Sequence, residues 1–556
     1  MDCFPSAWHA VVDHLGAAGV TVLFGLPGDD LALLPALDAG GPRLVLCRDQ
    51  RNAVFMATGY AVQSGAPGVC VLGKGPAVAN AVTGLAEARS GSAPLVVLSG
   101  GIPAEHRGSG AFQELDHLGL VAPVVKWAHR VDHPSRVLPA LEKAFLVARS
   151  GAPGPVYLEI PDDLGSIEVP ARPWSPPPVL ARSVPPREDG ALDAVRAAER
   201  PVVLVGGGMR HRAADGVVER FADALGAAVV CTASGRGAVL EDHPSFCGLS
   251  GLYAPAAMAP LWETTDLVIA VGSRLEETAT FGWRPDLPVV QVNRDAAELS
   301  TEHPCARIVG DGADVLDRWT RAVADRPPNA DWRAAIRRCR EDLHAGAEAE
   351  LARMRADPRL HVAEVLAAID AVVPPSRVLV QENGLQDMWS YAFPYHVCRS
   401  RGGSVVPSEQ TSLGFGAAAA AGVRLAAPDR PVIAFVGDGA YTLFRSDVDT
   451  VRREGIGVVY VVLCNGGYGW LHAQRAGRGL DAQRYPFAAD PPPDGPVITD
   501  RARLEDALRE AVVTSERRGV VTVHVAVELT DTPPGIDEPD GDFAAAAGGT
   551  GHAVQR

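Results

Sequence analysis

Two short apolar runs, each ending in glycine or asparagine, constrain the fold of this chain most strongly. The first run, Val432 to Val436, stops at Gly437-Asp438-Gly439, and the second, Val458 to Leu463, is followed shortly by Asn465. Short β-branched runs of this kind are typical of buried parallel strands. The sequence between them has room for one helix, expected near residues 446–453. Asp438 and Asn465 can therefore both reach one sheet edge, where open α/β sheets bind ligands.

The residues at these strand ends offer oxygen ligands. Mg²⁺ prefers oxygen ligands and is usually bound by protein oxygens together with substrate phosphates. The chain offers it one carboxylate (Asp438), one amide oxygen (Asn465) and a backbone carbonyl near Gly467. The pattern predicts a divalent metal that holds a diphosphate. The alternative is a pair of ordinary strand-end turns, because Gly-Asp-Gly alone is common.

Length and composition narrow the class of protein. At 556 residues the chain is too long for one core and fits about three domains. A net charge of −16 without a basic cluster argues against nucleic acid or an anionic membrane as a partner. No uncharged apolar stretch approaches the ~18 residues of a membrane span, and the N-terminus lacks a basic signal region. Nine scattered cysteines without a CxxC pair favour a reduced, cytoplasmic location.

Alternating strand and helix patterns predict an α/β fold of three doubly wound domains with parallel sheets. In the first block the expected strands are 21–24, 69–72, 95–98 and 156–160. The glycines after Pro201 to Val205 are a weak sign of a nucleotide-type turn. The expected segments are a first domain (1–168), a proline-rich linker (169–189), a central domain (190–330), a helical linker (331–357), a third domain (358–535) and a disordered tail (536–556).

The glycine motif and several further segments resemble a known family. Gly437-Asp438-Gly439 followed by Cys464-Asn465 resembles the thiamine-diphosphate motif, with Cys464 where the first asparagine usually stands. Other segments resemble acetolactate synthase and its relatives over roughly residues 1 to 475. These segments are Phe24–Gly28 (FGxPG), Phe112–Asp116 (FQExD), Lys126-Trp127, Gly151–Val156 (GxPGPV) and Ser412–Gly416.

The resemblance implies thiamine diphosphate (ThDP) and Mg²⁺ as cofactors, bound between pyrimidine-binding and diphosphate-binding domains of two chains, and hence a homodimer or homotetramer. It assigns Asp438, Asn465 and Gly467 to the metal. It gives Leu413 the role of propping the bent cofactor, beside the backbone of Thr411. The other cofactor-binding positions that it implies are Pro27, Gly28, Gly75, Asn80, Gln386, Gly437, Gly439, Ala440 and Tyr468.

The chain departs from the family at the residue that activates the cofactor. In the family a glutamate exchanges a proton with the pyrimidine ring, and burial and a hydrogen bond tune its pKa. Counting back from Gly59-Tyr60-Ala61, this position is Gln50, whose amide can hydrogen-bond but cannot exchange a proton. A register slip of one residue would instead place Asp49 there. Gln50, Asp49 and Gln113 are the candidate catalytic residues.

Further departures concern the substrate and a flavin. Gln474 stands where acetolactate synthases have a tryptophan that favours a second 2-oxo acid. Thr278 replaces a flavin-contacting arginine, and the strand end Gln291–Arg294 lacks the expected acidic residue, which argues against bound FAD. The stretch after Tyr485 lacks the usual helix, so a shortened active-site lid is expected.

Several residues have two open interpretations. Cys464 is a reactive thiol or a small buried substitute for asparagine, and Gln113 lines the active site or a helix surface. His472 faces substrate or solvent, and Lys74 contacts an anionic substrate or solvent. Gln386 touches the bound intermediate or is structural.

The leading hypothesis is an acetolactate-synthase-like carboligase or decarboxylase. It would act on a 2-oxo acid, with an aldehyde or second oxo acid as a specialised acceptor. The alternative is a catalytically silent ThDP-binding paralogue that serves as a partner or regulatory subunit. Loss of the glutamate favours this alternative, and retention of Asp438, Asn465 and Leu413 disfavours it.

Overall fold

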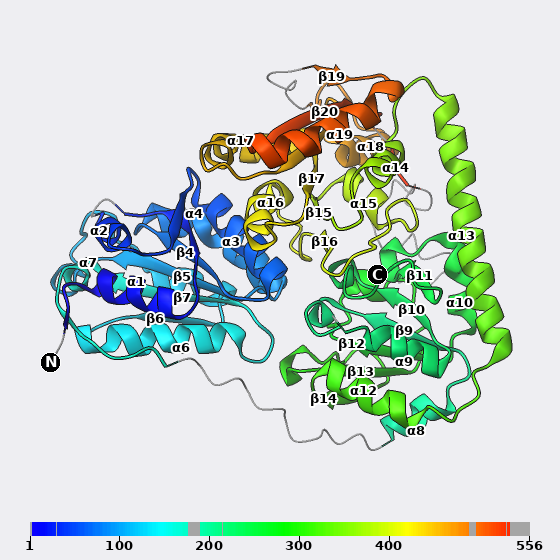
Figure 1. Cartoon of the computed structure of the whole chain (residues 1–556), viewed down its shortest axis with the longest axis horizontal. Helices are drawn as coiled ribbons and strands as arrows, with labels where there is room; N and C mark the ends of the chain where they lie inside the picture. The colour runs from blue at the N-terminus through cyan, green and yellow to red at the C-terminus, as the bar shows by residue number, and fades with distance from the viewer. Residues whose placement is uncertain are drawn as a thin grey trace.

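The computed structural model describes residues 3–28, 31–175, 190–213, 215–488, 496–529 and 531–533. Within these residues the chain forms three α/β units, each built on a six-stranded parallel sheet covered by helices (Figure 1). The doubly wound fold expected from the alternation of strands and helices is therefore confirmed. None of the helices described is both long and apolar enough to span a membrane.

The N-terminal unit has the strand order β3-β2-β4-β5-β7-β6. Its strands are β2 (Val22–Leu26), β3 (Arg43–Leu46), β4 (Gly68–Leu72), β5 (Leu95–Gly101), β6 (Trp127–Arg130) and β7 (Pro155–Pro161). Its helices are α1 (Ala7–Ala17), α2 (Leu33–Asp38), α3 (Gln50–Ser64), α4 (Pro76–Ser90), α5 (His117–Val121), α6 (Val137–Arg149) and α7 (Asp162–Gly165). The winding reverses between β2 and β4, so the loops after these strands border a crevice suited to ligands.

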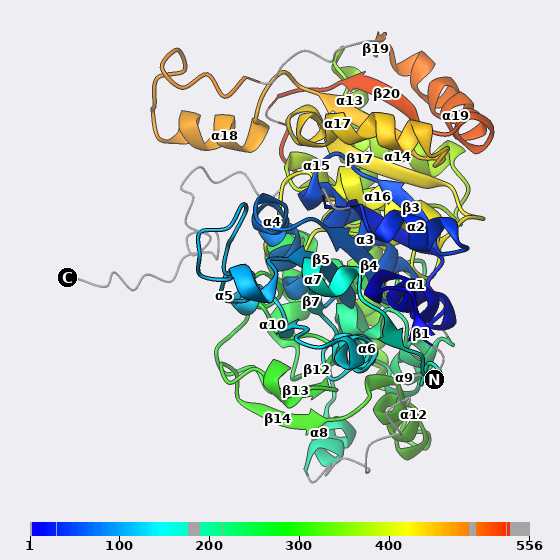
Figure 2. The same ribbon diagram turned by 90° about the vertical axis from the view of Figure 1, so that its left-hand side faces the viewer.

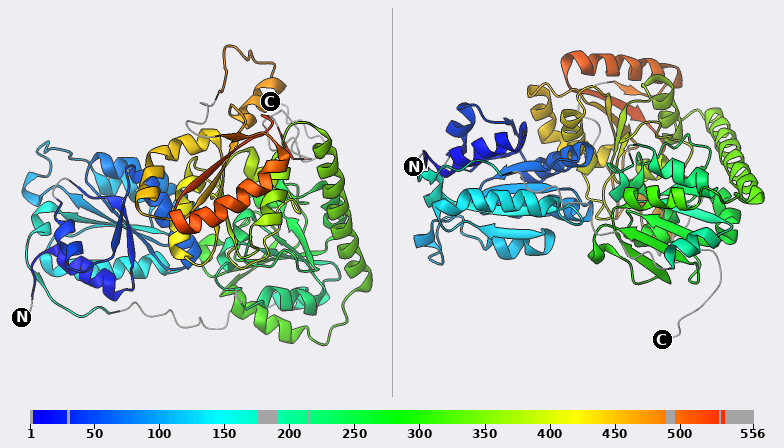
Figure 3. Two further views of the ribbon diagram at one scale, coloured as in Figure 1. Left: turned by 45° about the horizontal axis from the view of Figure 1, so that its top comes forward. Right: turned by 60° about the horizontal axis from the view of Figure 1, so that its bottom comes forward.

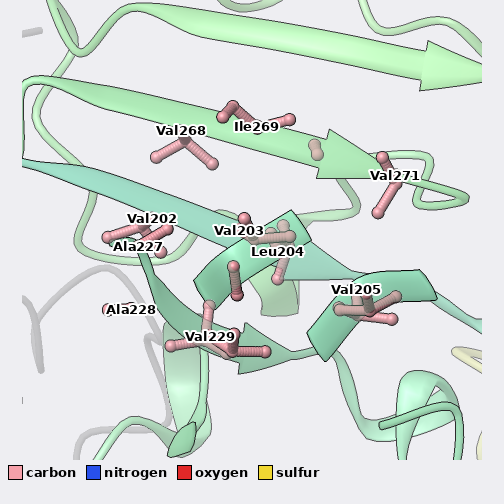
Figure 4. Close-up of a cluster of buried hydrophobic side chains, with 14 of the residues drawn as sticks. Val202, Val203, Leu204, Val205, Ala227, Ala228, Val229, Val268, Ile269 and Val271 are labelled. Carbon is pink, nitrogen blue, oxygen red and sulfur yellow. The ribbon is translucent and has the colours of Figure 1, made fainter. Parts of the chain in front are cut away.

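The central unit has the order β11-β10-β9-β12-β13-β14. Its strands are β9 (Pro201–Val205), β10 (Ala228–Cys231), β11 (Phe246–Leu249), β12 (Leu267–Val271), β13 (Val289–Asn293) and β14 (Cys305–Val309). Its helices are α8 (Ala191–Ala197), α9 (Val217–Leu225), α10 (Ala259–Thr264), α11 (Glu277–Thr280) and α12 (Gly312–Ala322). Buried valines of neighbouring strands, such as Val203 and Val268, form its core (Figure 4). Both faces of this sheet are apolar because helices cover both.

The C-terminal unit has the order β16-β15-β17-β18-β20-β19, with its winding reversal between β15 and β17. Its strands are β15 (Val378–Gln381), β16 (Ser404–Val405), β17 (Val432–Gly437), β18 (Val459–Cys464), β19 (Val497–Ile498) and β20 (Val521–Ala526). Its helices are α14 (Val362–Val372), α15 (Leu385–Tyr391), α16 (Phe415–Ala426), α17 (Asp438–Arg453), α18 (Gly469–Gly477) and α19 (Arg501–Arg518). Helix α18 stands out from the body of the molecule (Figure 2).

The connections between units differ in part from expectation. The charged segment predicted as a helix is α13 (Ala330–Ala356), which joins the central and C-terminal units. The proline-rich stretch does not begin as a free linker, because β8 (Val169–Pro170) pairs with β1 (Cys3–Phe4) in an antiparallel ribbon. Residues 176–189 of the linker and the tail 536–556 lie outside the described residues.

Helix α17 begins earlier than predicted. It starts at Asp438 instead of near Ser446, so β17 runs directly into the helix with Gly437 as its N-cap. The sequence suggested a turn because glycines flank Asp438. A carboxylate in the first helical turn is favourable, however, because it faces the positive end of the helix dipole.

The N-terminal and C-terminal units are joined through helices α3 and α16, which lie side by side (Figure 3). The two backbones touch at glycines: a Cβ on Gly59 would lie 2.3 Å from the Ala419 carbonyl oxygen, and one on Gly422 would lie 1.8 Å from that of Met56. Larger residues at these two positions would push the units apart.

Candidate active site

Asp438 and Asn465 lie together at the carboxyl ends of β17 and β18. These strands pair in parallel, with Gly437 opposite Leu463. Asp438 Oδ2 accepts hydrogen bonds from the backbone N–H groups of Asn465 (3.1 Å) and Gly466 (3.0 Å). The Asn465 side-chain oxygen accepts from Gly467 N (3.2 Å). The expectation that both side chains reach one sheet edge is confirmed, and their role as metal ligands stays a prediction.

Burial and backbone hydrogen bonds act in opposite directions on the Asp438 carboxyl. Burial raises the pKa of its carboxyl, and bonds from the N–H groups of Gly466, Gly439 and Asn465 work against this rise. The start of α17 adds a positive helix end that attracts phosphate. Among the described residues, no group of three or more His, Cys, Asp or Glu side chains could hold a metal. A metal here would therefore need amide, carbonyl or diphosphate oxygens besides Asp438.

The neighbours of this edge are Gln386, Tyr468, Ala440 and Cys464. The Gln386 amide nitrogen donates to the backbone carbonyls of Glu382 (3.1 Å) and Asn383 (3.0 Å), and its carbonyl oxygen faces Gly437. The half-exposed Tyr468 ring lies over Gly439, beside Ala440 in the first turn of α17.

Cys464 has an unreactive environment. Burial, with a contribution from the nearby Asp438 carboxylate, raises the pKa of its thiol to about 12. The thiol is therefore protonated at neutral pH, which supports the interpretation of Cys464 as a small substitute for asparagine.

His472 has both ring nitrogens engaged within the protein. Nε2 lies 3.2 Å from the Phe487 carbonyl oxygen, and Arg475 donates to Nδ1 (2.7 Å). Phe487 belongs to the segment expected to lack a helix, and residues 486–488 are indeed not helical. Residues 489–495 lie outside the described part. Gln474 lies on α18, as expected.

Leu413 protrudes from the loop between β16 and α16. The residue is 50 % exposed. Thr411 has a positive φ of 45°, and Gly414 one of 89°. Two buried glutamates, Glu87 and Glu382, accept hydrogen bonds from this loop. Both were missed at the sequence level because their partners are distant in the chain.

Asp49 and Gln50 have different surroundings. Asp49 is the N-cap of α3, and its Oδ1 accepts from the backbone N–H groups of Arg51 (2.8 Å) and Asn52 (3.2 Å). Gln50 is the first residue of α3, and its side-chain oxygen accepts from Asn80 Nδ2 (2.8 Å) on α4. The Asp49 carboxylate caps the helix and also accepts a longer bond from Asn80 Nδ2 (3.4 Å), whereas Gln50 makes the shorter bond to this amide and caps nothing. This arrangement favours the ungapped register.

Gly75 and Gln113, two of the predicted site residues, are brought together, and the role of Gln113 stays a prediction. A Cβ on Gly75, whose φ is 58°, would lie 2.7 Å from the Gln113 carbonyl oxygen. Gly75 N donates to His117 Nε2 (2.8 Å), and His117 Nδ1 lies 3.1 Å from Glu159 Oε2. Burial alone would raise the pKa of Glu159, but His117 and Arg130 hold it below its ordinary value.

The remaining residues of the FQExD segment have structural roles. Glu114 accepts from the backbone N–H groups of Gly108 (2.5 Å), Gly110 (2.9 Å) and Ala111 (3.2 Å), and Asp116 caps α5. Phe112 is 77 % exposed. The segment therefore shapes the loop before α5 and presents Phe112 at the surface.

Lys74 pairs with Asp162 instead of facing solvent alone. Both border a small cavity beside Pro27 and Gly28, which lie after β2. Lys126, of the Lys-Trp segment, donates to three backbone carbonyls, those of Val147, Ser150 and Ala152. Its role in the structure is to fix the turn that contains Gly151 to Gly154.

A cavity of about 290 Å³ lies where the three units meet. Its wall includes the Gly207–Gly208 turn after β9, Arg274 after β12, and residues 406–409. Thr278 donates to Glu409 Oε1 (2.6 Å), while the buried Gln291 and Asn293 amides donate to the Ser273 carbonyl (3.0 and 3.3 Å). The residues that replace the expected flavin contacts are therefore bonded within the protein.

Comparison with known proteins agrees with this geometry. Family models of thiamine pyrophosphate enzymes match in three places: the N-terminal TPP binding domain over residues 6–120, the central domain over 189–319 and the C-terminal TPP binding domain over 383–525.

Three relatives show how far the similarity extends. The acetolactate synthase isozyme 1 large subunit of Escherichia coli (strain K12) is 29% identical over 94% of this chain and 95% of its own length. The isozyme 2 large subunit of the same organism is 30% identical over 82% of each chain. Acetolactate synthase of Mycobacterium bovis is 30% identical over 95% of this chain and 87% of its own. The chain therefore belongs to the thiamine pyrophosphate enzymes, and within them it resembles the acetolactate synthase large subunits.

Proposed function

We propose that this chain is a ThDP- and Mg²⁺-dependent enzyme that decarboxylates a 2-oxo acid or joins it to a second carbonyl compound. The observation that carries the proposal is the meeting of Asp438 and Asn465 at the start of α17. When bound, ThDP supplies a nucleophilic carbon for the 2-oxo group and an acceptor for the electron pair left as CO₂ departs. The protein supplies binding, orientation and a shielded site.

Asp438, the Asn465 side-chain oxygen and the Gly467 carbonyl would hold Mg²⁺. Hard oxygen donors at the end of a parallel strand match this ion, which completes its shell with diphosphate oxygens and water. The N–H group of Ala440 in the first turn of α17 would face the diphosphate, because the N–H groups at a helix N-terminus lack intrahelical partners and attract anions.

The pyrimidine end of the cofactor would meet Leu413 and the backbone of Thr411. Gln50 would stand where the family has its glutamate, held by the Asn80 amide. An amide there can position the ring by a hydrogen bond but cannot exchange a proton with it. We therefore expect cofactor activation to be slow relative to enzymes that carry the glutamate.

We propose a homodimer, or a homotetramer built from such dimers, in which each cofactor lies between two copies. Three large residues of the segments that the resemblance assigns to the site, Phe112, Leu413 and Tyr468, are 77 %, 50 % and 46 % exposed in the single chain. A second copy would bury them and gain the corresponding hydrophobic free energy. Sedimentation velocity with and without ThDP tests this proposal.

The substrate pair is proposed to differ from that of branched-chain synthesis, because Gln474 replaces a tryptophan. We also propose that the chain works without FAD, since Thr278, Gln291 and Asn293 are bonded within the protein. Mass spectrometry of ligands released from the purified protein tests this, and stoichiometric FAD would refute it.

The second candidate, a silent ThDP-binding paralogue, is favoured by one observation, the amide of Gln50 in the glutamate position. The two functions are separated by incubating the protein with ThDP, Mg²⁺ and a panel of 2-oxo acids while released CO₂ is measured. Decarboxylation of any panel member supports the enzyme. Tight ThDP binding without CO₂ release from any of them supports the silent paralogue.

A further inference from the structure

The loop that carries Leu413 has little support of its own. It runs from Val405, the end of β16, to Gly414, the N-cap of α16, and it contains neither a helix nor a strand. Its internal bonds are few: Thr411 N donates to the Ser408 carbonyl (2.8 Å), and Gln410 N to the Ser408 hydroxyl (3.1 Å). Thr411 and Gly414 both have positive φ angles. Such a loop needs outside contacts to hold one conformation.

The first outside contact comes from the N-terminal unit. Glu87 lies on α4 and is 1 % exposed. Its two carboxylate oxygens accept from two loop amides: one from Ser408 N, the other from Ser412 N (3.1 Å). A fully buried carboxylate is costly unless its oxygens are bonded, so these two bonds stabilise both the glutamate and the loop.

The second outside contact comes from the C-terminal unit itself. Glu382 follows β15 and is fully buried. Its Oε1 accepts from Gly414 N (3.0 Å) and its Oε2 from Ala417 N (3.2 Å), which are among the free N–H groups at the start of α16. Gly414 has no side chain with which to cap the helix, so Glu382 caps it from another part of the chain. Leu413 lies between the segments held by the two glutamates.

Resting on the proposed function, we propose that Glu87 is a positioning residue. It fixes the Leu413 loop to the N-terminal, pyrimidine-binding unit. The leucine side chain is thereby held in the position in which it would keep the cofactor bent. Glu382 fixes the other end of the loop, and Glu87 couples its middle to the neighbouring unit. Glu409 of the same loop also accepts from Thr278 of the central unit (2.6 Å), so the position of the leucine depends on how the units pack and not on the loop sequence alone.

The direct test is the exchange of backbone amides for deuterium in the protein without cofactor. In the wild-type chain the Ser412 amide should exchange as slowly as amides within α16, while that of Gln410 exchanges faster. In Glu87→Gln one carboxylate oxygen becomes an NH₂ group, which cannot accept a hydrogen bond from the loop N–H that it faces. Exchange across residues 408–412 should then rise about tenfold to hundredfold, the factor that follows from a lost hydrogen bond to a charged group.

The second measurement is the affinity for ThDP in the presence of Mg²⁺. Inorganic diphosphate, also measured with Mg²⁺, is the comparison ligand. Glu87→Gln should weaken ThDP binding about tenfold and leave diphosphate binding unchanged, because Asp438 and Asn465 are untouched. Asp295→Asn is the matched control, since Asp295 also accepts a backbone N–H across a unit boundary, from Ala152 (2.8 Å), while its other bond is to Ala297 of its own unit and not to the loop. It should change neither the exchange of residues 408–412 nor ThDP affinity.

Each outcome decides one claim. Rapid exchange of the wild-type Ser412 amide, or no change in Glu87→Gln, overturns the positioning role. An equal effect of Asp295→Asn also overturns it, because general loosening of the units would then be the cause. Wild-type protein that binds no ThDP refutes the proposed function instead, and the exchange of residues 408–412 in the cofactor-free protein still tests the loop.

Discussion

Replacing Gln50 with glutamate should activate the cofactor at almost no cost in stability. The new carboxylate can keep the bond from Asn80, now 2.8 Å long, and it stands in the first turn of α3. A negative charge there gains about 0.3–1 kcal/mol from the helix dipole. Repulsion from the neighbouring, partly exposed Asp49 carboxylate costs about 1 kcal/mol at most in water. The two effects nearly cancel, so the melting temperature should shift by less than about 4 °C.

The effect on chemistry should be large by comparison. A correctly placed acid–base group contributes about 10²- to 10⁴-fold. Exchange of the thiazolium C2 proton for deuterium, followed by NMR after rapid quenching with ThDP bound, should therefore accelerate at least about a hundredfold. Asp49→Asn is the control, because asparagine caps helices as well as aspartate does and should leave exchange unchanged. No acceleration in Gln50→Glu, or slowed exchange in Asp49→Asn, would refute the assignment of Gln50 to this position.

Three further predictions concern stability and reactivity. Lys126→Met leaves three backbone carbonyls without their donor and should lower the free energy of unfolding by about 2–4 kcal/mol in a denaturant titration. Because the thiol pKa of Cys464 is about 12, iodoacetamide at pH 8 should modify it only after unfolding, and rapid labelling of the folded protein would contradict this. Burial raises the pKa of Glu382 to about 7, so its contribution to stability is fully present below about pH 4.5 and is lost as the pH rises through about 7. Relative to wild type, Glu382→Gln should therefore gain about 2–3 kcal/mol between pH 5 and pH 8, and a difference that does not vary with pH would show that Glu382 does not titrate there.

The strands were predictable because each is a compact apolar run. Residues 69–72 and 432–436 correspond to β4 and β17 within one residue. The start of α17 was not predictable, because Gly437-Asp438-Gly439 is also a good turn sequence. Only the tertiary structure shows that Asp438 belongs to the helix. Local patterns thus identify buried elements better than their ends.

The site was predictable only where the residues themselves carry the chemistry. Asp438 and Asn465 were identified from their strand ends. Glu87 and Glu382 were not, because neither belongs to a recognisable motif and their bonded partners in the loop lie tens or hundreds of residues away. The hydrogen bond between Gln50 and Asn80 could not be predicted either, because it depends on the packing of α3 against α4. Contacts of this kind follow from topology and cannot be deduced from spacing.

The proposed function depends on Asp438, which would hold the metal that anchors the diphosphate of the cofactor. Titration calorimetry of ThDP in the presence of Mg²⁺ tests it with Asp438→Asn, which keeps one oxygen for the backbone N–H groups and should fold normally by circular dichroism. Since even indirect contacts to a metal are worth about 10- to 100-fold in affinity, loss of a direct ligand should weaken ThDP binding at least a hundredfold. Binding of ThDP that is as tight in the variant as in the wild type would contradict the account.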